Sequence, residues 1–293
     1  MKKTLVSHFY NEAWLLPHWL KHHREIFDHG IMIDYRSTDR SCEIIRELCP
    51  TWEIRLTRNA DFSASSVDSE VAEIERTIEG WRTTLNTTEF LIGNYDHLND
   101  DPNPRQIFVE QYMFVDMERR DEPYYLTSDL PLYKQRWHGY GPEKWDHTKT
   151  QAYGSVTRPA RSVHNHAIDY NADGGTLGRH FWNQKATYPD LAIFYYGYAS
   201  LEEGSIKRKM QIQTQIPSGG TNHHFNLDQL MDRFKREQQP LSSDIRAQIK
   251  PLVDAHENYL FCKNQPVKVD FTEHKTNIQN AIDVLNTTLS KLQ

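Results

Sequence analysis

Short apolar runs alternate with amphipathic segments along the first part of the chain. Residues 4–9, 31–34, 52–56 and 81–92 each read as a buried strand, because apolar and β-branched residues cluster there between turn formers. Between these runs, apolar residues recur at helical spacing, which predicts amphipathic helices. Strands that alternate with helices are typical of an α/β domain, in which helices flank a mostly parallel central sheet.

The second half of the chain adds further strands and then becomes helical. Strands are predicted at 106–115, 154–163 and 191–198. Helices are predicted at 226–237, 242–259 and 272–292, separated at Pro240 and Pro266. We therefore expect an α/β domain at 1–225 and a C-terminal helical extension at 226–293. One alternative left open is that these helices act as a scaffold or join copies of the chain into a homo-oligomer.

The run that begins at Trp81 becomes polar before it ends. Asn86, Thr88 and Glu89 cluster where its apolar character stops. In open α/β sheets, ligands bind just outside the carboxyl ends of the strands, so this cluster is expected to face a substrate. The alternative is a strand followed by an ordinary turn.

Composition and charge narrow the classes of partner. The chain has 293 residues, with 34 Lys and Arg against 40 Asp and Glu, a net charge of −6. This balance argues against binding nucleic acid or an anionic membrane, since both require a basic surface. The sparse cysteines, Cys42, Cys49 and Cys262, are typical of a reducing compartment. The chain shows neither the apolar run of a signal peptide nor a stretch that could span a membrane, so we expect a cytoplasmic location.

Polar residues follow the first two predicted strands. Asp34 and Asp39 stand at the end of the second strand, and a carboxylate there can accept a hydrogen bond from a base N–H or a ribose hydroxyl. His8, Tyr10 and Glu12 come from the end of the first strand and are expected to converge on the same place. The alternative is structural, with Asp39 as a helix cap and Asp34 as a loop carboxylate.

Segments in a fixed order then suggest a family. They are Tyr10-Asn-Glu12, Trp19 with His23, Asp34-Tyr-Arg-Ser-Thr-Asp39, Leu85-Asn-Thr-Thr-Glu-Phe-Leu91, Val156-Thr-Arg-Pro159, His166, and Tyr195-Tyr-Gly-Tyr198 with Lys209. Over about residues 4–215, this set resembles the nucleotide-sugar half of GT-A-fold glycosyltransferases, the family-2-like and family-92-like members above all. The resemblance implies a GT-A (Rossmann-like) fold and transfer of a sugar from a UDP- or GDP-sugar to a hydroxyl of a glycan acceptor.

One departure from the family concerns the metal. The family's two D-x-D aspartates hold a divalent cation, and a histidine often adds a ligand, but these positions read Asn86, Thr88 and Tyr195 here. Neutral oxygens bind Mg²⁺ or Mn²⁺ much more weakly than carboxylates do. We therefore expect no cofactor and a metal-independent reaction, with Mg²⁺ or Mn²⁺ as the alternative. The basic triplet Lys207, Arg208 and Lys209 would then offset the diphosphate charge, with Lys207 and Lys209 placed at the donor, unless the triplet is only a solvated patch.

A general base is needed if the transfer inverts the anomeric centre. Glu89 and His166 are the candidates, with Asp116 and Glu118 behind them; the alternative for each is a packing or hydrogen-bonding role. The aromatic loop 124–145 and the segment around His166 are expected to form the acceptor side. The sequence thus predicts a glycosyltransferase, and the alternative is an inactive protein of the same fold that binds a nucleotide or carbohydrate.

Overall fold

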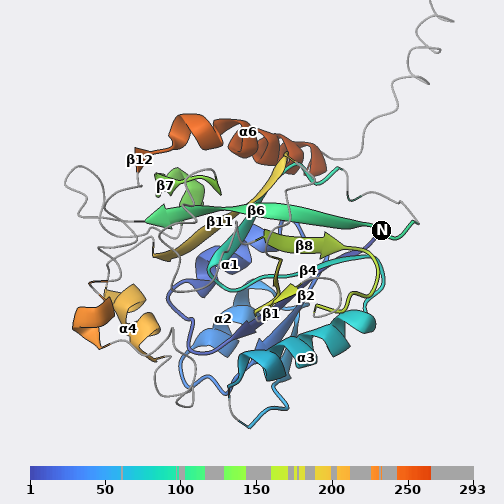
Figure 1. Ribbon diagram of the computed structural model, residues 1–293, viewed down its shortest axis with the longest axis vertical. Helices are drawn as coiled ribbons and strands as arrows, with labels where there is room; N and C mark the ends of the chain where they lie inside the picture. Colours follow the sequence, from blue (N-terminus) through green and yellow to red (C-terminus); the bar gives the residue numbers. More distant parts are fainter. Residues whose placement is uncertain are drawn as a thin grey trace, which may run out of the picture. The chain divides into compact units, whose positions relative to one another are not determined.

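The computed structural model describes residues 1–60, 62–96, 98, 103–115, 129–142, 160–170, 175–176, 178–181, 189–198, 203–211, 226–230, 232 and 243–264. The chain divides into two compact units, Met1–Tyr259 and Leu260–Gln293. The first unit contains the central sheet drawn in Figure 1 and all residues of the candidate site.

Parallel strands from the N-terminal part of the chain form one half of the sheet. They are β1 (Lys3–Phe9), β2 (His29–Asp34), β3 (Glu53–Leu56) and β4 (Trp81–Thr84), in the order β4-β1-β2-β3. Val6 of β1 lies opposite Ile31 on one side and Thr84 on the other. The carboxyl ends of these strands therefore lie at one edge of the sheet, here called the carboxyl edge.

The other half of the sheet mixes parallel and antiparallel strands. It contains β5 (Glu89–Gly93), β6 (Gln106–Val115), β7 (His138–Tyr140), β8 (Ala160–His164), β9 (Gly175–Thr176), β10 (His180–Phe181), β11 (Leu191–Tyr198) and β12 (Ser243–Asp244). β6 and β11 pair in parallel, whereas β8 runs antiparallel to both β4 and β6. With helices on its faces, this sheet confirms the predicted α/β class with a mostly parallel sheet.

The strand predicted from Trp81 to Ile92 is wrong in its extent. β4 ends at Thr84, and β5 is a separate strand that pairs antiparallel with β11. A turn separates the two strands, closed by a 2.9 Å hydrogen bond from the Glu89 N–H to the Asn86 carbonyl. Trp19 holds this turn in place, because its indole N–H donates to the carbonyls of both residues, at 3.1 Å and 2.9 Å.

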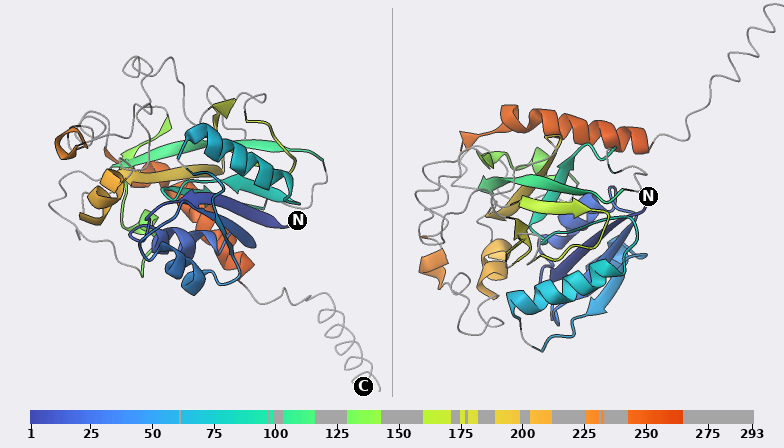
Figure 2. Two further views of the ribbon diagram at one scale, coloured as in Figure 1. Left: turned by 90° about the horizontal axis from the view of Figure 1, so that it is seen from below. Right: turned by 45° about the vertical axis from the view of Figure 1, so that its right-hand side comes forward.

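Helices cover both faces of the parallel half. On one face, α1 (Leu16–His23), α2 (Ser41–Leu48) and α6 (Arg246–Lys263) contribute to the main core, which Leu5 and Phe9 of β1 enter. On the other face, α3 (Ala64–Arg76) packs on Val6 of β1 and on β2. Figure 2 shows α3 on the opposite side of these strands from α1 and α2. The alternation of side chains along β1 therefore supplies two cores at once.

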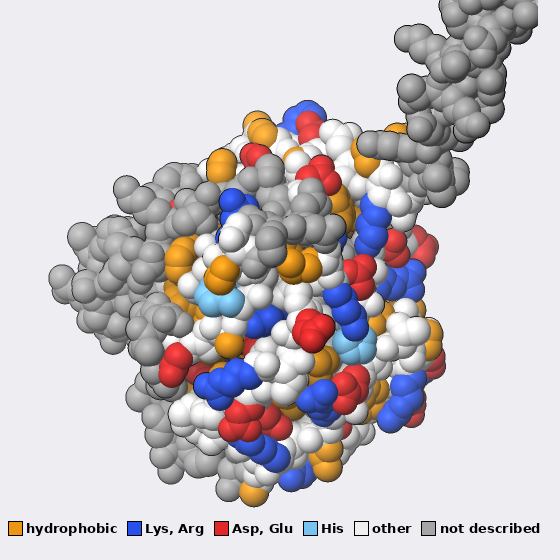
Figure 3. Space-filling model, turned by 90° about the vertical axis from the view of Figure 1, so that its right-hand side faces the viewer, with side chains coloured by type: hydrophobic (Ala, Val, Ile, Leu, Met, Phe, Trp, Pro, Cys, Tyr) orange, Lys and Arg blue, Asp and Glu red, His pale blue; other side chains and the backbone are white. Residues whose placement is uncertain are grey.

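The C-terminal prediction is met in part by what the structure describes. The predicted helix at 242–259 corresponds to α6, and residues 227–230 are also helical. The predicted boundary after residue 225 and the helix at 272–292 lie outside the described residues. In the described ranges, no helix combines the length and the apolar character needed to cross a membrane. On the face drawn in Figure 3, basic and acidic side chains are interspersed rather than gathered by sign.

Candidate functional site

The loops that follow β1 and β2 are joined by one side chain. The Asn11 side-chain oxygen accepts from the backbone N–H groups of Thr38, at 2.7 Å, and Asp39, at 3.2 Å. The Asn11 backbone N–H donates to Ser37 Oγ at 3.1 Å, and Asn11 itself has a positive φ of 51°. We call residues 10–13 and 35–41 the loop pair. The predicted convergence of these two strand ends is therefore present.

The two aspartates of this region, Asp34 and Asp39, differ in how their oxygens are bonded. Asp39 accepts from the Ala13 N–H at 3.0 Å and from the Ser41 N–H at 2.9 Å, so both of its oxygens organise the loop pair. Asp34 is 9% exposed and accepts from the Ser37 N–H at 2.8 Å with one oxygen. Its other oxygen has the Cys42 thiol at 3.5 Å, a weak donor. Asp34 is therefore the aspartate with acceptor capacity left for a ligand.

The Cys42 thiol stays protonated beside this carboxylate. Burial and the negative charge of Asp34 raise the pKa of Cys42 to about 11. Tyr10 is partly buried and packs against the core beneath α3. Both side chains therefore contribute contact surface here, and Cys42 contributes no charge at neutral pH.

The basic triplet faces the loop pair through its middle residue. Arg208, on α4 (Glu203–Gln211), is 5% exposed, and its Nη1 donates to Glu12 Oε1 at 3.1 Å. Lys207 is exposed, and Lys209 lies 4.5 Å above the ring of Tyr198. Of the three cations of the predicted triplet, Arg208 is thus the one that points inward.

The triplet alone could not indicate this choice. Successive helical residues point about 100° apart, so only one residue of three can face inward, and the phase must come from another buried position. Ser205, three residues earlier on α4, is buried as well and would have given that phase.

The ion pair between Arg208 and Glu12 leaves polar atoms unused. Arg208 Nε and Nη2 and Glu12 Oε2 are buried without a hydrogen-bond partner in the described structure.

Glu89 is occupied by a buried ion pair. It is 1% exposed, and Arg161 donates to both of its oxygens, from Nε at 3.0 Å and from Nη2 at 2.7 Å. The Asn86 N–H donates to the same carboxylate at 2.8 Å. Thr88 is buried, and its carbonyl accepts from the Tyr196 N–H at 2.8 Å. These contacts match the structural alternative for Glu89, since a general base needs an open lone pair next to the substrate.

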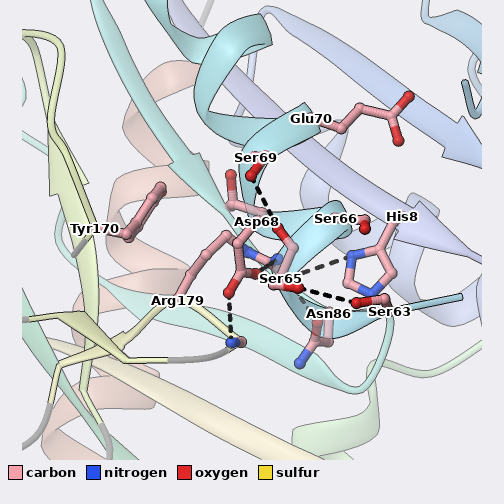
Figure 4. Close-up of polar contacts among 12 residues, drawn as sticks. His8, Ser63, Ser65, Ser66, Asp68, Ser69, Glu70, Asn86, Tyr170 and Arg179 are labelled. Carbon is pink, nitrogen blue, oxygen red and sulfur yellow. Dashed lines mark hydrogen bonds and ion pairs between the residues drawn. The ribbon is translucent and has the colours of Figure 1, made fainter. Parts of the chain in front are cut away.

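A second arginine lies beside Asn86. Arg179 is 2% exposed and pairs through Nη1 with Asp68 of α3, whose other oxygen accepts from the Gly178 N–H at 2.8 Å. Arg179 Nη2 lies 3.4 Å from His8 Nδ1 and 3.5 Å from Asn86 Oδ1. Figure 4 shows this arrangement. We call Arg161, Arg179 and their partners Glu89 and Asp68 the arginine cluster.

His8 is neutral in these surroundings. Burial lowers the pKa of His8 well below its ordinary value, and the positive charges of Arg179 and Arg161 lower it further. His8 thus meets the arginine cluster as an uncharged ring, although the sequence placed it with the nucleotide-binding residues.

His166 lies at the other edge of the sheet. β8 runs antiparallel to β4 with His164 opposite Arg82, so the chain leaves β8 at the amino end of β4. The structure therefore does not bring His166 to the carboxyl edge, and the predicted general-base and acceptor-side roles do not suit its position. Of the aromatic loop, Tyr133 and Tyr140 are buried in core clusters. Asp116 and Glu118 lie outside the described residues.

The residues at the end of β4 do not fit a divalent cation. Around Asn86, the Glu89 carboxylate is held by Arg161, and the Asn86 oxygen lies next to Arg179. A cation placed there would meet a carboxylate already paired with Arg161 and one neutral amide oxygen beside the Arg179–Asp68 pair. Within the described ranges, no group of three or more His, Cys, Asp or Glu side chains could hold a metal ion.

Comparisons with known proteins give weak likenesses. The sequence matches no family model and no curated protein. Among solved structures, S. aureus TarS 1-349 is 12% identical, with 94% of this chain and 78% of that chain covered and a TM-score of 0.37. The same protein in complex with UDP-GlcNAc gives 12% identity, 88% and 80% coverage and a TM-score of 0.36.

A further likeness is to mannose-1-phosphate geranyltransferase from Thermus thermophilus. It is 11% identical, with 67% of this chain and 58% of that chain covered and a TM-score of 0.26. Similarity as weak as this identifies neither a family nor an activity for this chain. The geometry of the carboxyl edge therefore has to support the functional argument by itself.

Proposed function

We propose that this chain is a GT-A-type glycosyltransferase that moves a sugar from a UDP- or GDP-sugar to a hydroxyl of a glycan acceptor. The observation that supports it most is the loop pair, where Asn11 holds the loop after β1 against the loop after β2 beside Asp34. Ligands of open α/β sheets bind outside the carboxyl ends of neighbouring strands, and this is such a place.

The nucleoside lies on the loop pair in this proposal. Asp34 accepts a hydrogen bond from the base or the ribose through the oxygen that now faces the Cys42 thiol. Tyr10, which packs against the core beneath α3, is the aromatic side chain of the loop after β1. Asp39 keeps the loops in register, as its two backbone hydrogen bonds indicate.

The donor diphosphate needs positive charge as it leaves. When the bond between the anomeric carbon and the phosphate oxygen breaks, the electron pair stays on that oxygen, and the acceptor oxygen forms the new bond and releases its proton to solvent. In this proposal the donor sugar and diphosphate lie near Asn86 and Thr88. Arg208, with two donor nitrogens that lack a partner in the described structure, meets the new charge, and transfer proceeds without a metal.

A second candidate is a nucleotide- or carbohydrate-binding protein without transferase activity. It is favoured by one observation, which is that neither predicted base is available: Glu89 is paired with Arg161, and His166 lies at the opposite edge. The two candidates differ in turnover and agree in binding.

A panel of UDP- and GDP-sugars tests both candidates. We expect one donor to stabilise the fold against heat by mass action and to be hydrolysed or transferred to a glycan. Activity should persist in EDTA, and Mn²⁺ should not increase it. Loss of activity in EDTA with recovery in Mn²⁺ would contradict the metal-free mechanism. Binding without turnover would favour the second candidate, and binding of none of the panel would contradict both.

A further inference from the structure

Two buried arginines, each paired with one carboxylate, lie at the end of β4, where the resemblance leads one to expect a metal. Resting on the proposed function, we infer that the donor phosphates bind there directly to the Arg179 guanidinium and the N-terminus of α3, beside His8 and Asn86. Arg179 thereby shares with Arg208 the electrostatic role that a divalent cation would otherwise have.

Arg179 is only partly used by its protein partners. Its Nη1 is paired with Asp68, but Nε is buried without a hydrogen-bond partner in the described structure. The Nη2 contacts with His8 and Asn86 are long, at 3.4 Å and 3.5 Å, and both acceptors are neutral. A phosphate oxygen is a stronger acceptor than either of these, because charge-assisted hydrogen bonds are shorter and stronger than neutral ones. A phosphate can therefore displace these contacts without breaking the Asp68 pair.

Arg161 has a different part in the same cluster. Its Nε and Nη2 both donate to Glu89, and its Nη1 donates to the Gly178 carbonyl. These contacts fix the residue that precedes Arg179. Arg161 is therefore a positioning residue, and Arg179 is the one that can contact a ligand.

The N-terminus of α3 lies at the same place. α3 has 13 residues, and its N-cap, Ser63, makes no side-chain cap hydrogen bond. Ser63 and Ser65 are exposed, and their hydroxyls lie 2.9 Å apart. The ring of Phe62, the residue before Ser63, lies 6.2 Å from that of His8, and Asp68 of α3 pairs with Arg179. Figure 4 draws Ser63 and Ser65 together with His8 and Arg179. The first N–H groups of a helix and its dipole favour an anion.

His8 supports the site as a neutral ring. If Arg179 donates to His8 Nδ1, the neutral tautomer carries its proton on Nε2. An uncharged His8 also leaves Arg179 as the local cation. The neutral Asn86 amide likewise leaves Arg179 available, because a carboxylate at this position would pair with Arg179 and exclude a phosphate.

Binding in EDTA with three probes tests this inference on the full chain. Inorganic pyrophosphate reports the phosphate site, uridine reports the nucleoside site, and UDP reports both. R179Q should weaken pyrophosphate and UDP at least about tenfold and leave uridine within about twofold. R82Q is the matched control, since Arg82 is a buried arginine that donates to the carbonyls of Ile78 and Gly80.

A surface substitution covers the case in which R179Q does not fold. S65E places a carboxylate at the exposed N-terminus of α3, and S69E places the same charge one turn later at another exposed serine. S65E should weaken pyrophosphate at least about tenfold while leaving or raising the melting temperature, because an acidic residue suits a helix N-terminus. S69E should have a much smaller effect on pyrophosphate.

The outcomes separate this inference from the proposed function. If wild type binds UDP and neither R179Q nor S65E weakens it, the phosphate site is wrong and the function stands. If pyrophosphate binding requires Mn²⁺, the inference is also overturned. If pyrophosphate binds and depends on Arg179, but no nucleotide or nucleoside binds, the phosphate site stands and the proposed function fails.

Discussion

The loop pair and the arginine cluster lie along the same edge of the sheet, but they are held by different kinds of contact. In the loop pair, Asn11 and Asp39 bind backbone N–H groups of two neighbouring loops, and much of this region is partly exposed. In the arginine cluster, Arg161 and Arg179 are each 2% exposed and bind carboxylates. The loop pair is therefore held by a network of hydrogen bonds to the backbone, and the arginine cluster by buried ion pairs.

The difference indicates how each region can respond to a ligand. The loop pair is held by hydrogen bonds to the backbone, so the Asp34 carboxylate can bind a ligand without breaking an ion pair. Removing one member of a buried ion pair strongly destabilises the fold, because the remaining charge is neither paired nor solvated. The arginine cluster should therefore be rigid and costly to disrupt, whereas the loop pair should tolerate substitution and lose ligand affinity instead.

The largest expected effect comes from breaking the Arg161–Glu89 pair. R161Q should reduce the free energy of unfolding by about 3–5 kcal/mol, because it leaves the Glu89 carboxylate buried and unpaired. Urea denaturation measures this change. The double variant R161Q/E89Q should recover part of the loss, since the uncompensated charge is removed.

A matched control is R55Q, which removes an arginine from the half-exposed pair with Glu53. Its cost should stay below about 1 kcal/mol. If R161Q lowers the free energy of unfolding no more than R55Q does, buried charge does not explain the contrast between the two regions.

Next in size is an effect on the loop pair. D34N should weaken uridine about tenfold, which is about 1.4 kcal/mol, and leave pyrophosphate unchanged. Titration calorimetry with both probes shows whether the carboxyl edge holds separate nucleoside and phosphate sites. The control is E43Q, on the exposed side of α2, which should change neither affinity. Equal loss of both probes in D34N would mean that the two regions act as one site.

The last effect is a pH dependence of stability through His8. The folded state lowers the pKa of His8, so below a pH of about 6.5 the unfolded chain binds a proton that the folded chain does not. The free energy of unfolding should therefore fall as the pH falls, by at most about 1.4 kcal/mol per pH unit for this one group.

H8Q should flatten this slope between pH 7 and 5, as measured by urea denaturation at each pH. His22 and His256, whose pKa values burial lowers to about 4 and about 2, contribute equally to wild type and variant and cancel in the comparison. The comparison variant is H29Q, at a partly exposed ring at the start of β2, whose pKa burial also lowers, so H29Q should flatten the slope less than H8Q does. An unchanged slope in H8Q would mean that burial and the arginine cluster do not hold His8 neutral.

The pattern of the sequence was sufficient wherever the relevant contacts are local or repeat along the chain. The alternation of strands and helices predicted the α/β class, and the Tyr10-Asn-Glu12 and Asp34–Asp39 segments predicted the loop pair. Parallel strands place their carboxyl ends together, so the positions of these segments followed once the strands were recognised. The structural alternative for Asp39 is met in part: Asp39 accepts from the N–H of Ser41, the first residue of α2, but Arg40 occupies the N-cap position.

Only the tertiary structure decided the charges of the site. Arg161 meets Glu89 across 72 residues, Arg179 meets His8 across 171, and Arg208 meets Glu12 across 196. Nothing in a local pattern of apolar and polar residues encodes such a pair, because any of the chain's arginines could serve as the partner of a given carboxylate. The sequence therefore determined which strand ends meet, and long-range packing determined which cations meet them there.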